Sequence, residues 1–355
     1  MATAVHQLVP SFAPRNAIGN HVLQVQSVLR GMGLESEIWV GDAWKEVAHL
    51  SKPYREQPVR EGQWLLYQAS TGSPVADWLR ERPEPKLLNY HNITPAELFA
   101  PWEPHVGVEL NAGRRQLAEL APHTELAVAV STYNESELVR AGYRHTAVVP
   151  ILLDTSTFDR AEDVAAVERL TVPGPVWLFV GRLAPNKAQH DLIKALSVYR
   201  RVYDPTATLR LVGGSSSHAY ATAVEGLVRA LQLEDAVELC GDVSDAELDA
   251  HYRAADVFVS TSDHEGFCIP LLESMHHRLP IVAFGSSAIP ETLGGAGICL
   301  SSKEPTRVAA AVHRVLGDPA LQGTLARAGE ARLADFDLDV NRRRMAEVVG
   351  AALGA

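Results

Sequence analysis

VWLFVGRLAPNKAQHDLIKAL, residues 176–196, is the stretch that decides the fold. It opens with five apolar residues, VWLFV, which are typical of a buried strand. A loop with glycine and proline follows, and QHDLIKAL then has the apolar spacing of a helix. This order of strand, loop and helix predicts one βα unit of an α/β protein.

The same order recurs through most of the chain. We expect strands at 4–9, 35–40, 63–67, 86–91, 126–131, 146–152, 176–180, 208–212, 236–240, 256–260, 281–284 and 297–300. We expect helices at 20–32, 108–121, 188–203, 219–232, 245–254, 268–278, 304–316, 319–334 and 338–353. Apolar strands that alternate with helices imply parallel sheets covered on both faces. The predicted fold class is therefore α/β, with two doubly wound Rossmann-like domains that face each other across a cleft.

The chain of 355 residues has the length of two domains. We place the first at 1–157 and the second at 158–337, with the seam in a polar stretch after the last strand of the first half. The sequence leaves open where the last helix, about 338–355, packs, and the first domain is one candidate. In such domains ligands bind beyond the carboxyl ends of the strands.

Composition excludes several functional classes. The net charge is -11 and the chain has no basic tail or stripe, so a nucleic-acid partner is not expected. The first residues lack a basic start with a long apolar run, which favours a cytoplasmic protein; attachment of a local patch to the inner membrane face stays an alternative. The three cysteines have no zinc-ligand spacing, so no metal site is predicted.

The loop 181–187, GRLAPNK, lies between a predicted strand and helix. It lacks the second glycine and the Ser or Thr of a Walker-type phosphate loop. A loop that opens a helix still presents backbone N–H groups, and Arg182 and Lys187 add two cations. These features suit a diphosphate, and the alternative is a pair of solvated cations.

The segment 264–273, HEGFCIPLLE, follows the predicted strand DVFVS. Gly266 permits close backbone approach, and Pro270 suits a first helical turn, so the N–H groups of 266–269 would point at a ligand. Glu265 lies in the loop and Glu273 one turn inside the helix, where one would contact a sugar and the other a ribose. The alternative is two unrelated surface and helix-face glutamates.

Three weaker candidates lie in the first half, each at a strand end. Gly19, in NAIGNH after the first strand, allows a backbone to approach a phosphate, and Asn16 opens the same segment. His91 and Asn92 form a polar cluster after 86–91, although a structural histidine is an equal alternative. Ser131 and Asn134 begin the next helix, where capping by Ser131 is favoured.

Taken in order, these segments resemble the retaining nucleotide-sugar glycosyltransferases of GT-B architecture, in particular the large bacterial family of group 1 transferases. The resemblance covers most of the chain. It is strongest over about 176–300, where GRLAPNKAQHDLIKAL, LRLVGG, VELCGDVSDAELDAHYRAADVFVSTSDHEGFCIPLLESM and LPIVAFGSSAIPE follow in the family's order.

The resemblance assigns roles in the second half position by position. Arg182 and Lys187 match the family's pair on the donor diphosphate. Glu265 opens the family's element of two glutamates and would contact the transferred sugar, while Glu273 would bind the ribose hydroxyls. The remaining expected donor contacts are the amides of Gly266, Phe267, Cys268 and Ile269 and the nucleobase neighbour Val243.

In the first half, the resemblance is less complete. Gly19 matches the glycine loop that approaches the donor, and His91 matches a histidine near the sugar, which we group with Arg182, Lys187 and Glu265 as catalytic. The acceptor-side residues would be Asn16, Asn92, Ser131 and Asn134. The chain departs from the family in having one glycine where many members have two, and Asn16 where relatives often carry Asp.

The resemblance implies transfer of a hexose from a GDP- or UDP-linked sugar to a hydroxyl of a glycan, lipid-linked sugar or small molecule. It implies retention of the anomeric configuration and no cofactor or metal. The alternatives are a nucleotide-sugar epimerase of the same architecture and a non-catalytic nucleotide-sugar-binding relative. Donor base, sugar, acceptor and oligomeric state are not specified by the sequence.

Overall fold

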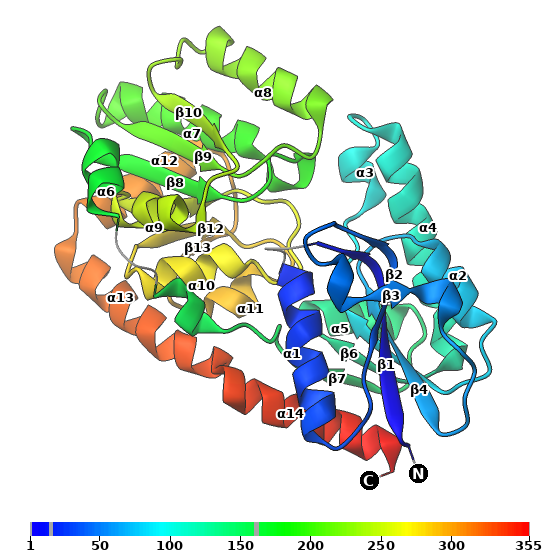
Figure 1. Cartoon of the computed structure of the whole chain (residues 1–355). Helices are drawn as coiled ribbons and strands as arrows, with labels where there is room; N and C mark the ends of the chain where they lie inside the picture. Colours follow the sequence, from blue (N-terminus) through cyan, green and yellow to red (C-terminus); the bar gives the residue numbers. More distant parts are fainter. Residues whose placement is uncertain (1, 14–16, 160–162, 355) are drawn as a thin grey trace. The chain divides into compact units, whose positions relative to one another are not determined.

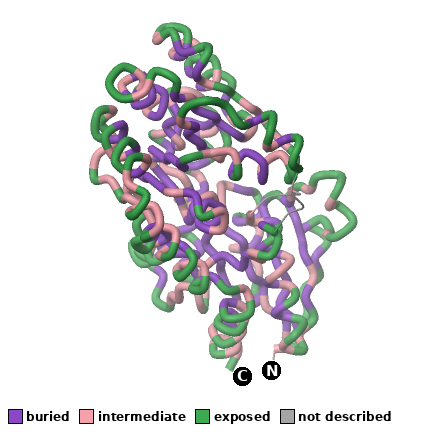
Figure 2. Tube along the Cα trace, turned by 90° about the vertical axis from the view of Figure 1, so that its left-hand side faces the viewer, coloured by how far each residue is buried: buried purple, intermediate pink, exposed green. Residues whose placement is uncertain are grey.

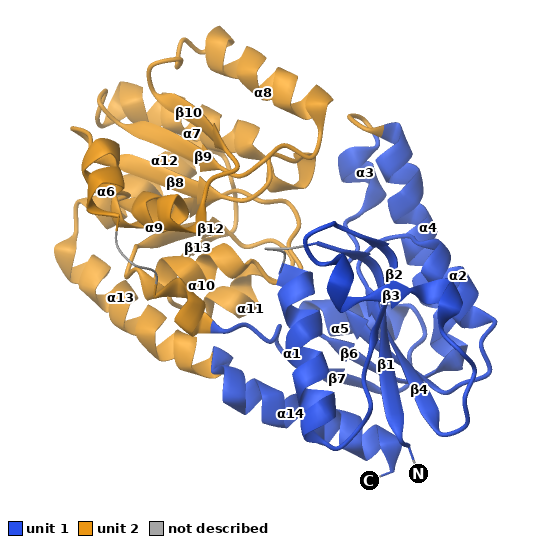
Figure 3. Cartoon of the chain, viewed as in Figure 1, with its two compact units in different colours: residues 1–100, 104–154, 336–355 blue, residues 101–103, 155–335 orange. Residues whose placement is uncertain are grey.

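The computed structural model describes residues 2–13, 17–159 and 163–354. The chain divides into two compact units (Figure 3). Unit 1 comprises residues 1–100, 104–154 and 336–355, and unit 2 comprises 101–103 and 155–335. The division after residue 154 lies beside the seam that the sequence suggested at 157/158.

Unit 1 contains a seven-stranded sheet in the order β3-β2-β1-β4-β5-β6-β7, and every neighbouring pair is parallel (Figure 1). The strands are β1 Ala4–Phe12, β2 Ile38–Ala43, β3 Lys52–Pro53, β4 Gln63–Ala69, β5 Lys86–Tyr90, β6 Thr124–Ala129 and β7 Thr146–Val148. The helices are α1 Ala17–Gly31, α2 Pro74–Arg80, α3 Ala96–Phe99, α4 Pro104–Leu120, α5 Thr132–Arg140 and α14 Leu338–Leu353.

Unit 2 contains a six-stranded parallel sheet in the order β10-β9-β8-β11-β12-β13. The strands are β8 Val176–Val180, β9 Thr208–Val212, β10 Val237–Gly241, β11 Val257–Ser260, β12 Ile281–Phe284 and β13 Ile298–Leu300. The helices are α6 Val164–Leu170, α7 Gln189–Val202, α8 His218–Ala230, α9 Asp245–Arg253, α10 Ile269–His276, α11 Ile289–Leu293, α12 Pro305–Leu316 and α13 Pro319–Leu333.

The apolar runs form strands because both faces of each sheet are covered. In β8, Trp177 and Phe179 belong to one buried cluster, while Leu178 between them belongs to another. Successive side chains of a strand point to opposite faces, so each cluster lies on its own side of the sheet. The buried strands appear as purple runs in Figure 2. The predicted α/β class with two doubly wound units is confirmed.

The strand order fixes where ligands can bind. Both sheets follow the 3-2-1-4-5-6 pattern, in which the chain reverses direction across the sheet between the first and fourth strands. This switch point lies between β1 and β4 in unit 1 and between β8 and β11 in unit 2. The loops that follow these strands are therefore the natural places for a site.

Several predicted strands differ from the observed ones at their ends, and two of them show the causes. The strand expected at 146–152 ends at Val148, because Pro150 has no N–H to donate to a ladder. The strand expected at 35–40 begins only at Ile38, and Glu35 forms an isolated bridge with Ala4. Both errors concern the ends of elements and not their existence.

The C-terminal helix α14 packs on α1 within unit 1 (Figure 1). Its residues Met345 and Val349 are buried in one cluster with Val25 and Leu29 of α1. At the edge of this contact, Arg342 Nε donates to the Gln24 side-chain oxygen at 3.1 Å. The chain thus returns from unit 2 to complete the core of unit 1.

Truncation of Met345 tests this packing. Met345 is 1% exposed, so Met345→Ala leaves a cavity, and we expect the free energy of unfolding to fall by about 2–5 kcal/mol. Val340 on the same helix is 47% exposed, so Val340→Ala should change the free energy of unfolding by less than about 0.5 kcal/mol. Chemical denaturation measures both, and equal effects of the two substitutions would contradict the packing.

Candidate functional site

The loops after β8 and β11 meet at the switch point of unit 2. The ammonium of Lys187 lies 2.7 Å from both carboxylate oxygens of Glu265, although the two residues are 78 positions apart. The Lys187 side chain is 18% exposed and that of Glu265 is 9% exposed. A largely desolvated ion pair of this kind is far less screened than a surface pair. The structure therefore brings together the two charged groups that the sequence singled out.

Hydrogen bonds to backbone carbonyls hold the two loops side by side. The carbonyl of Asn186 accepts from the N–H of Asp263 at 2.8 Å, and the Asn186 amide donates to the His264 carbonyl at 3.2 Å. Thr261 Oγ1 donates to the Ala188 carbonyl at 3.0 Å. Ala188 is fully buried with φ of +49°, a left-handed conformation that costs a non-glycine residue energy and persists only under such constraint.

Glu265 is also fixed from the side of α11. Its backbone N–H donates to Ser287 Oγ at 2.7 Å, and its carbonyl accepts from the N–H of Ala288 at 3.3 Å. The carboxylate is thus positioned by its own backbone, by Lys187 and by the segment before α11. Rigid placement of a charged group is what preorganised stabilisation of a reacting ligand requires.

Glu273 lies one turn inside α10 and is held by a tyrosine. The Tyr252 hydroxyl donates to Glu273 Oε2 at 2.9 Å, and the Tyr252 ring stacks on His277 with ring centroids 5.0 Å apart. Both Tyr252 and Glu273 are buried. The sequence did not point to Tyr252, because nothing in its local pattern distinguishes it from a core tyrosine.

The helix α10 starts at Ile269, next to the start near Pro270 that the motif predicted. Cys268 precedes the helix with φ of +74°, and Pro270 occupies its first turn. Phe267 and Cys268 are buried, whereas Gly266 and Ile269 are half-buried. The Phe267 carbonyl accepts from Thr292 Oγ1 at 2.6 Å, which joins this turn to α11.

Arg182 lies on the same loop as Lys187, and Val243 lies on the loop after β10. Arg182 is exposed, and its carbonyl accepts from the Gln189 amide at 2.9 Å, which ties the loop to the start of α7. Val243 is half-buried and packs against the cluster that contains Cys268. Their expected contacts with a diphosphate and a nucleobase stay predictions.

In unit 1, Gly19 lies in the first turns of α1, and Asn16 lies outside the described residues. A Cβ at Gly19 would come within 2.6 Å of the Ala13 carbonyl oxygen, so this close approach of α1 to Ala13 requires glycine. This close approach is an internal reason for the glycine, and it leaves the expected contact with a donor as a prediction.

The acceptor-side candidates Asn92, Ser131 and Asn134 form one polar cluster in unit 1. The Asn92 amide donates to Asn134 Oδ1 at 2.8 Å and to Glu137 Oε2 at 3.1 Å. Ser131 accepts from the N–H of Asn134 at 3.2 Å and so caps α5. The favoured capping interpretation of Ser131 agrees with this geometry.

Glu137 is a residue of this cluster that the sequence did not suggest. It is buried, accepts from the Tyr90 hydroxyl at 2.9 Å and pairs with Arg114 at 3.0 Å. A charged residue inside the amphipathic pattern of a helix is the only sequence signal it offers. The cluster satisfies a buried carboxylate and fixes the backbone next to His91.

His91 follows β5 and is 9% exposed. Its Nε2 lies 2.7 Å from Gln68 Oε1, and its ring meets that of His21 edge-on with centroids 5.0 Å apart. Burial lowers the pKa of His91 to about 3, so the ring is neutral at physiological pH. The sequence had left a structural histidine and a site histidine as equal alternatives.

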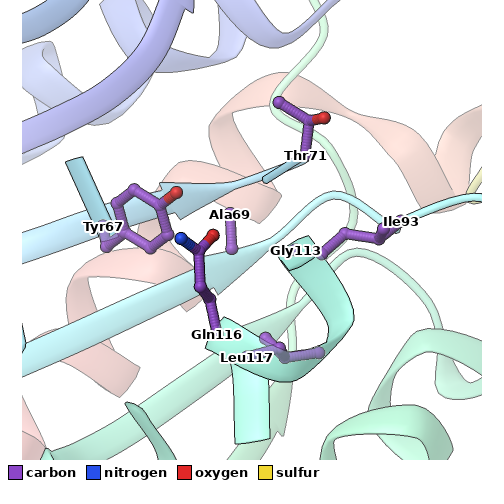
Figure 4. Close-up of a pocket in the computed structure, with 7 residues that line it drawn as sticks. All are labelled: Tyr67, Ala69, Thr71, Ile93, Gly113, Gln116 and Leu117. Atoms are coloured by element: carbon purple, nitrogen blue, oxygen red, sulfur yellow. The ribbon is translucent and has the colours of Figure 1, made fainter. Parts of the chain in front are cut away.

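Other features of the described chain do not add a site. The hollow in Figure 4, lined by Tyr67, Thr71 and Gln116 among others, has no space for a water molecule and is a packing gap. Within the described ranges, no three His, Cys, Asp or Glu side chains gather closely enough to hold a metal ion. No helix there has the length and apolar character needed to cross a membrane.

The site lies within a segment that matches a known protein family. Residues 174–318, which carry both loops and α10, match the family model described as glycosyl transferases group 1. The expected resemblance to this family is confirmed. The family model covers most of unit 2 and none of the β1–β7 sheet.

Two curated relatives illustrate the similarity. A D-inositol 3-phosphate glycosyltransferase of Kineococcus radiotolerans is 33% identical over 257 residues, which is 65% of this chain and 59% of the relative. A GDP-mannose-dependent alpha-(1-6)-phosphatidylinositol monomannoside mannosyltransferase of Mycobacterium tuberculosis is 31% identical over 225 residues, 59% of this chain and 57% of the relative. The matches thus span a little under six tenths of each relative.

A solved structure establishes the fold over the whole chain. HepE of Anabaena, determined in complex with UDP and glucose, superposes with a TM-score of 0.75 at 18% identity and covers 98% of this chain and 100% of its own. With the two doubly wound sheets, this likeness shows the GT-B fold predicted from the sequence.

The neutral His91 predicts a pH dependence of stability. In the unfolded chain this histidine takes up a proton below pH 6.5, whereas in the native protein it does so only at about pH 3. Its contribution to the free energy of unfolding is therefore complete above pH 6.5 and is lost as the pH falls toward 3. The free energy of unfolding then falls by up to about 1.4 kcal/mol per pH unit. His91→Gln should flatten this slope in denaturation curves between pH 6.5 and 4.

The exposed His123 provides the control, because His123→Gln should leave the slope as in the unsubstituted protein. His21 adds a slope of the same sign, since burial and the neighbouring His91 hold its pKa well below 6.5. An unchanged slope in His91→Gln would contradict the assignment of a neutral, buried ring.

Proposed function

We propose that this chain is a retaining, metal-independent glycosyltransferase that moves a hexose from a nucleoside diphosphate sugar to a hydroxyl acceptor. The observation that carries the proposal is the Lys187–Glu265 ion pair at the switch point of unit 2. The Lys187 ammonium lies 2.7 Å from the Glu265 carboxylate, beside the start of α10. It lies within the residues that match the group 1 family.

The chemistry of transfer explains why these groups suit the site. Cleavage of the anomeric bond leaves negative charge on the diphosphate and positive charge on the sugar ring. Lys187 and Arg182 would stabilise the leaving diphosphate, together with the N–H groups at the start of α10. Glu265 would contact the sugar and Glu273 the ribose, with Val243 against the base.

Double displacement is one route to retention, but it does not suit the two glutamates of this site. That scheme needs two carboxyl groups about 5–5.5 Å apart across the bond being broken. Glu265 is engaged by Lys187 and Glu273 by Tyr252, and both would lie on one side of the donor. We therefore propose transfer on the front face, where the leaving phosphate oxygen takes the proton of the acceptor hydroxyl.

The donor is proposed as a GDP- or UDP-linked hexose. The mannosyltransferase relative is named for GDP-mannose, and the HepE structure contains UDP and glucose. The acceptor is a hydroxyl of a glycan, a lipid-linked sugar or a small molecule. No divalent ion is needed in this proposal, because the two cations of the loop 181–187 take its place, and activity should survive EDTA.

Product analysis tests the reaction class. Incubation with UDP-glucose or GDP-mannose and candidate acceptors should give a glycoside whose anomeric proton shows the configuration of the donor by NMR. An inverted anomer would contradict the mechanism. Free nucleotide with an altered sugar in the absence of acceptor would identify an epimerase, and binding without turnover would identify a non-catalytic relative.

Substitution of Lys187 tests its role in charge stabilisation. We expect Lys187→Ala to lower kcat by about 10²–10³-fold, equivalent to about 2.7–4 kcal/mol, because one preorganised donor to the leaving group is lost. Lys194→Ala, which removes an exposed lysine on α7, should leave kcat unchanged. Near-normal turnover of Lys187→Ala with donor bound would argue against the role.

A further inference from the structure

A series of three buried polar side chains, joined by hydrogen bonds, crosses the sheet of unit 1. His91 Nε2 lies 2.7 Å from Gln68 Oε1, Gln68 Nε2 lies 2.7 Å from Gln7 Oε1, and Gln7 Nε2 donates to the carbonyl of Val22 at 2.9 Å. Gln7 is on β1, Gln68 on β4 and His91 directly after β5. Gln7 and Gln68 are fully buried.

The Val22 carbonyl, at the end of this series of side chains, determines the direction of every hydrogen bond in the series. A backbone carbonyl can only accept, so Gln7 must turn its NH₂ toward Val22 and its oxygen toward Gln68. Gln68 must then offer its NH₂ to Gln7 and its oxygen to His91. Since that oxygen can only accept, Nε2 of His91 carries the proton, and Nδ1 is left as a lone pair.

This lone pair has no hydrogen-bond partner in the described part of the chain, and the atom is shielded from solvent. Almost all buried polar atoms in native proteins are paired, so an unpaired acceptor calls for an explanation. The neutral state of the ring, produced by burial, means that Nδ1 is an acceptor across the physiological pH range.

The neighbouring His21 shows the contrast. Its Nδ1 accepts from the N–H of Leu152 at 2.8 Å, and the Asn89 side-chain amide lies against its Nε2. Since Nδ1 accepts, Nε2 must carry the proton, and it donates to Asn89 when the side-chain amide is turned so that its oxygen faces the ring. The same turn pairs the Asn89 oxygen, which is otherwise buried without a partner among the described residues. Both nitrogens of His21 are therefore used inside the fold, and only one nitrogen of His91 is.

We propose that Gln7 and Gln68 are positioning residues that hold His91 as the Nε2–H tautomer, so that Nδ1 stays an acceptor for the sugar contact that the family resemblance implies. The ligand assignment rests on the proposed transferase function. A lone pair accepts from hydroxyls and repels phosphate oxygens, so His91 recognises the sugar and not the diphosphate. Because Nδ1 is covered, pairing requires a local rearrangement around the ring.

The experiment reads the tautomer directly. In protein labelled with ¹⁵N-histidine, long-range ¹H–¹⁵N NMR distinguishes protonated from unprotonated ring nitrogens, and His91 is assigned from the signals missing in His91→Gln. We expect Nε2 protonated and Nδ1 unprotonated at neutral pH. Gln68→Met and Gln7→Met should both yield a tautomer mixture, although Gln7 does not touch the ring.

Gln63→Met is the matched control. Gln63 is another buried glutamine of β4, but it hydrogen-bonds to the Pro58 carbonyl and Glu84, so its loss should leave the His91 tautomer unchanged. An Nδ1–H tautomer in the unsubstituted protein, or an unshifted tautomer in Gln7→Met, would overturn the positioning role. This readout needs no substrate, so it stands apart from the proposed function.

The ligand role is tested with UDP-glucose and GDP-mannose as probes. Binding of either should shift the His91 Nδ1 resonance, and kcat/KM should fall about tenfold in Gln7→Met and Gln68→Met, the effect of one hydrogen bond. An unshifted resonance under saturation would overturn the sugar contact alone. Failure of every nucleotide sugar to bind would overturn the proposed function and this contact together, while the tautomer result stands.

Discussion

The ion pair between Lys187 and Glu265 is the interaction on which the candidate site depends. It joins loops 78 residues apart and sets two opposite charges side by side in a largely desolvated place. A buried charge without its partner is expensive, so both loops must close for either charge to be tolerated. The pair therefore fixes the loop geometry and holds a cation and a carboxylate ready for a charged, polar ligand.

Topology explains why this pair forms where it does. The order β9-β8-β11-β12 makes β8 and β11 neighbours, and the chain leaves them toward opposite sides of the sheet. The loops that follow these two strands therefore start next to each other at the carboxyl ends of the strands, where the ion pair joins them. The hydrogen-bonded series of Gln7, Gln68 and His91 in unit 1 also lies at a switch point, because it crosses β1 and β4, which flank the switch point of that sheet.

Much of this could be predicted from the sequence, because strand, loop and helix signals are local. VWLFV, DVFVS and the loops after them gave the βα units, and the ordered motifs pointed to the GT-B fold. Contacts between distant residues have no local signal. The contact of Tyr252 with Glu273 depends on how α9 and α10 pack, and the contact of Gln68 with His91 depends on the alignment of neighbouring strands. A buried glutamine in QWLLYQA differs little in sequence from an exposed one. Asn16 lies outside the described residues.

The most direct test of the central claim is a crystal structure of this protein with a nucleoside diphosphate. The account predicts the diphosphate at the ends of β8 and β11, in contact with Lys187 and Arg182, and the ribose beside Glu273. A ligand bound elsewhere, with Lys187 and Glu265 engaged only with each other, would contradict it.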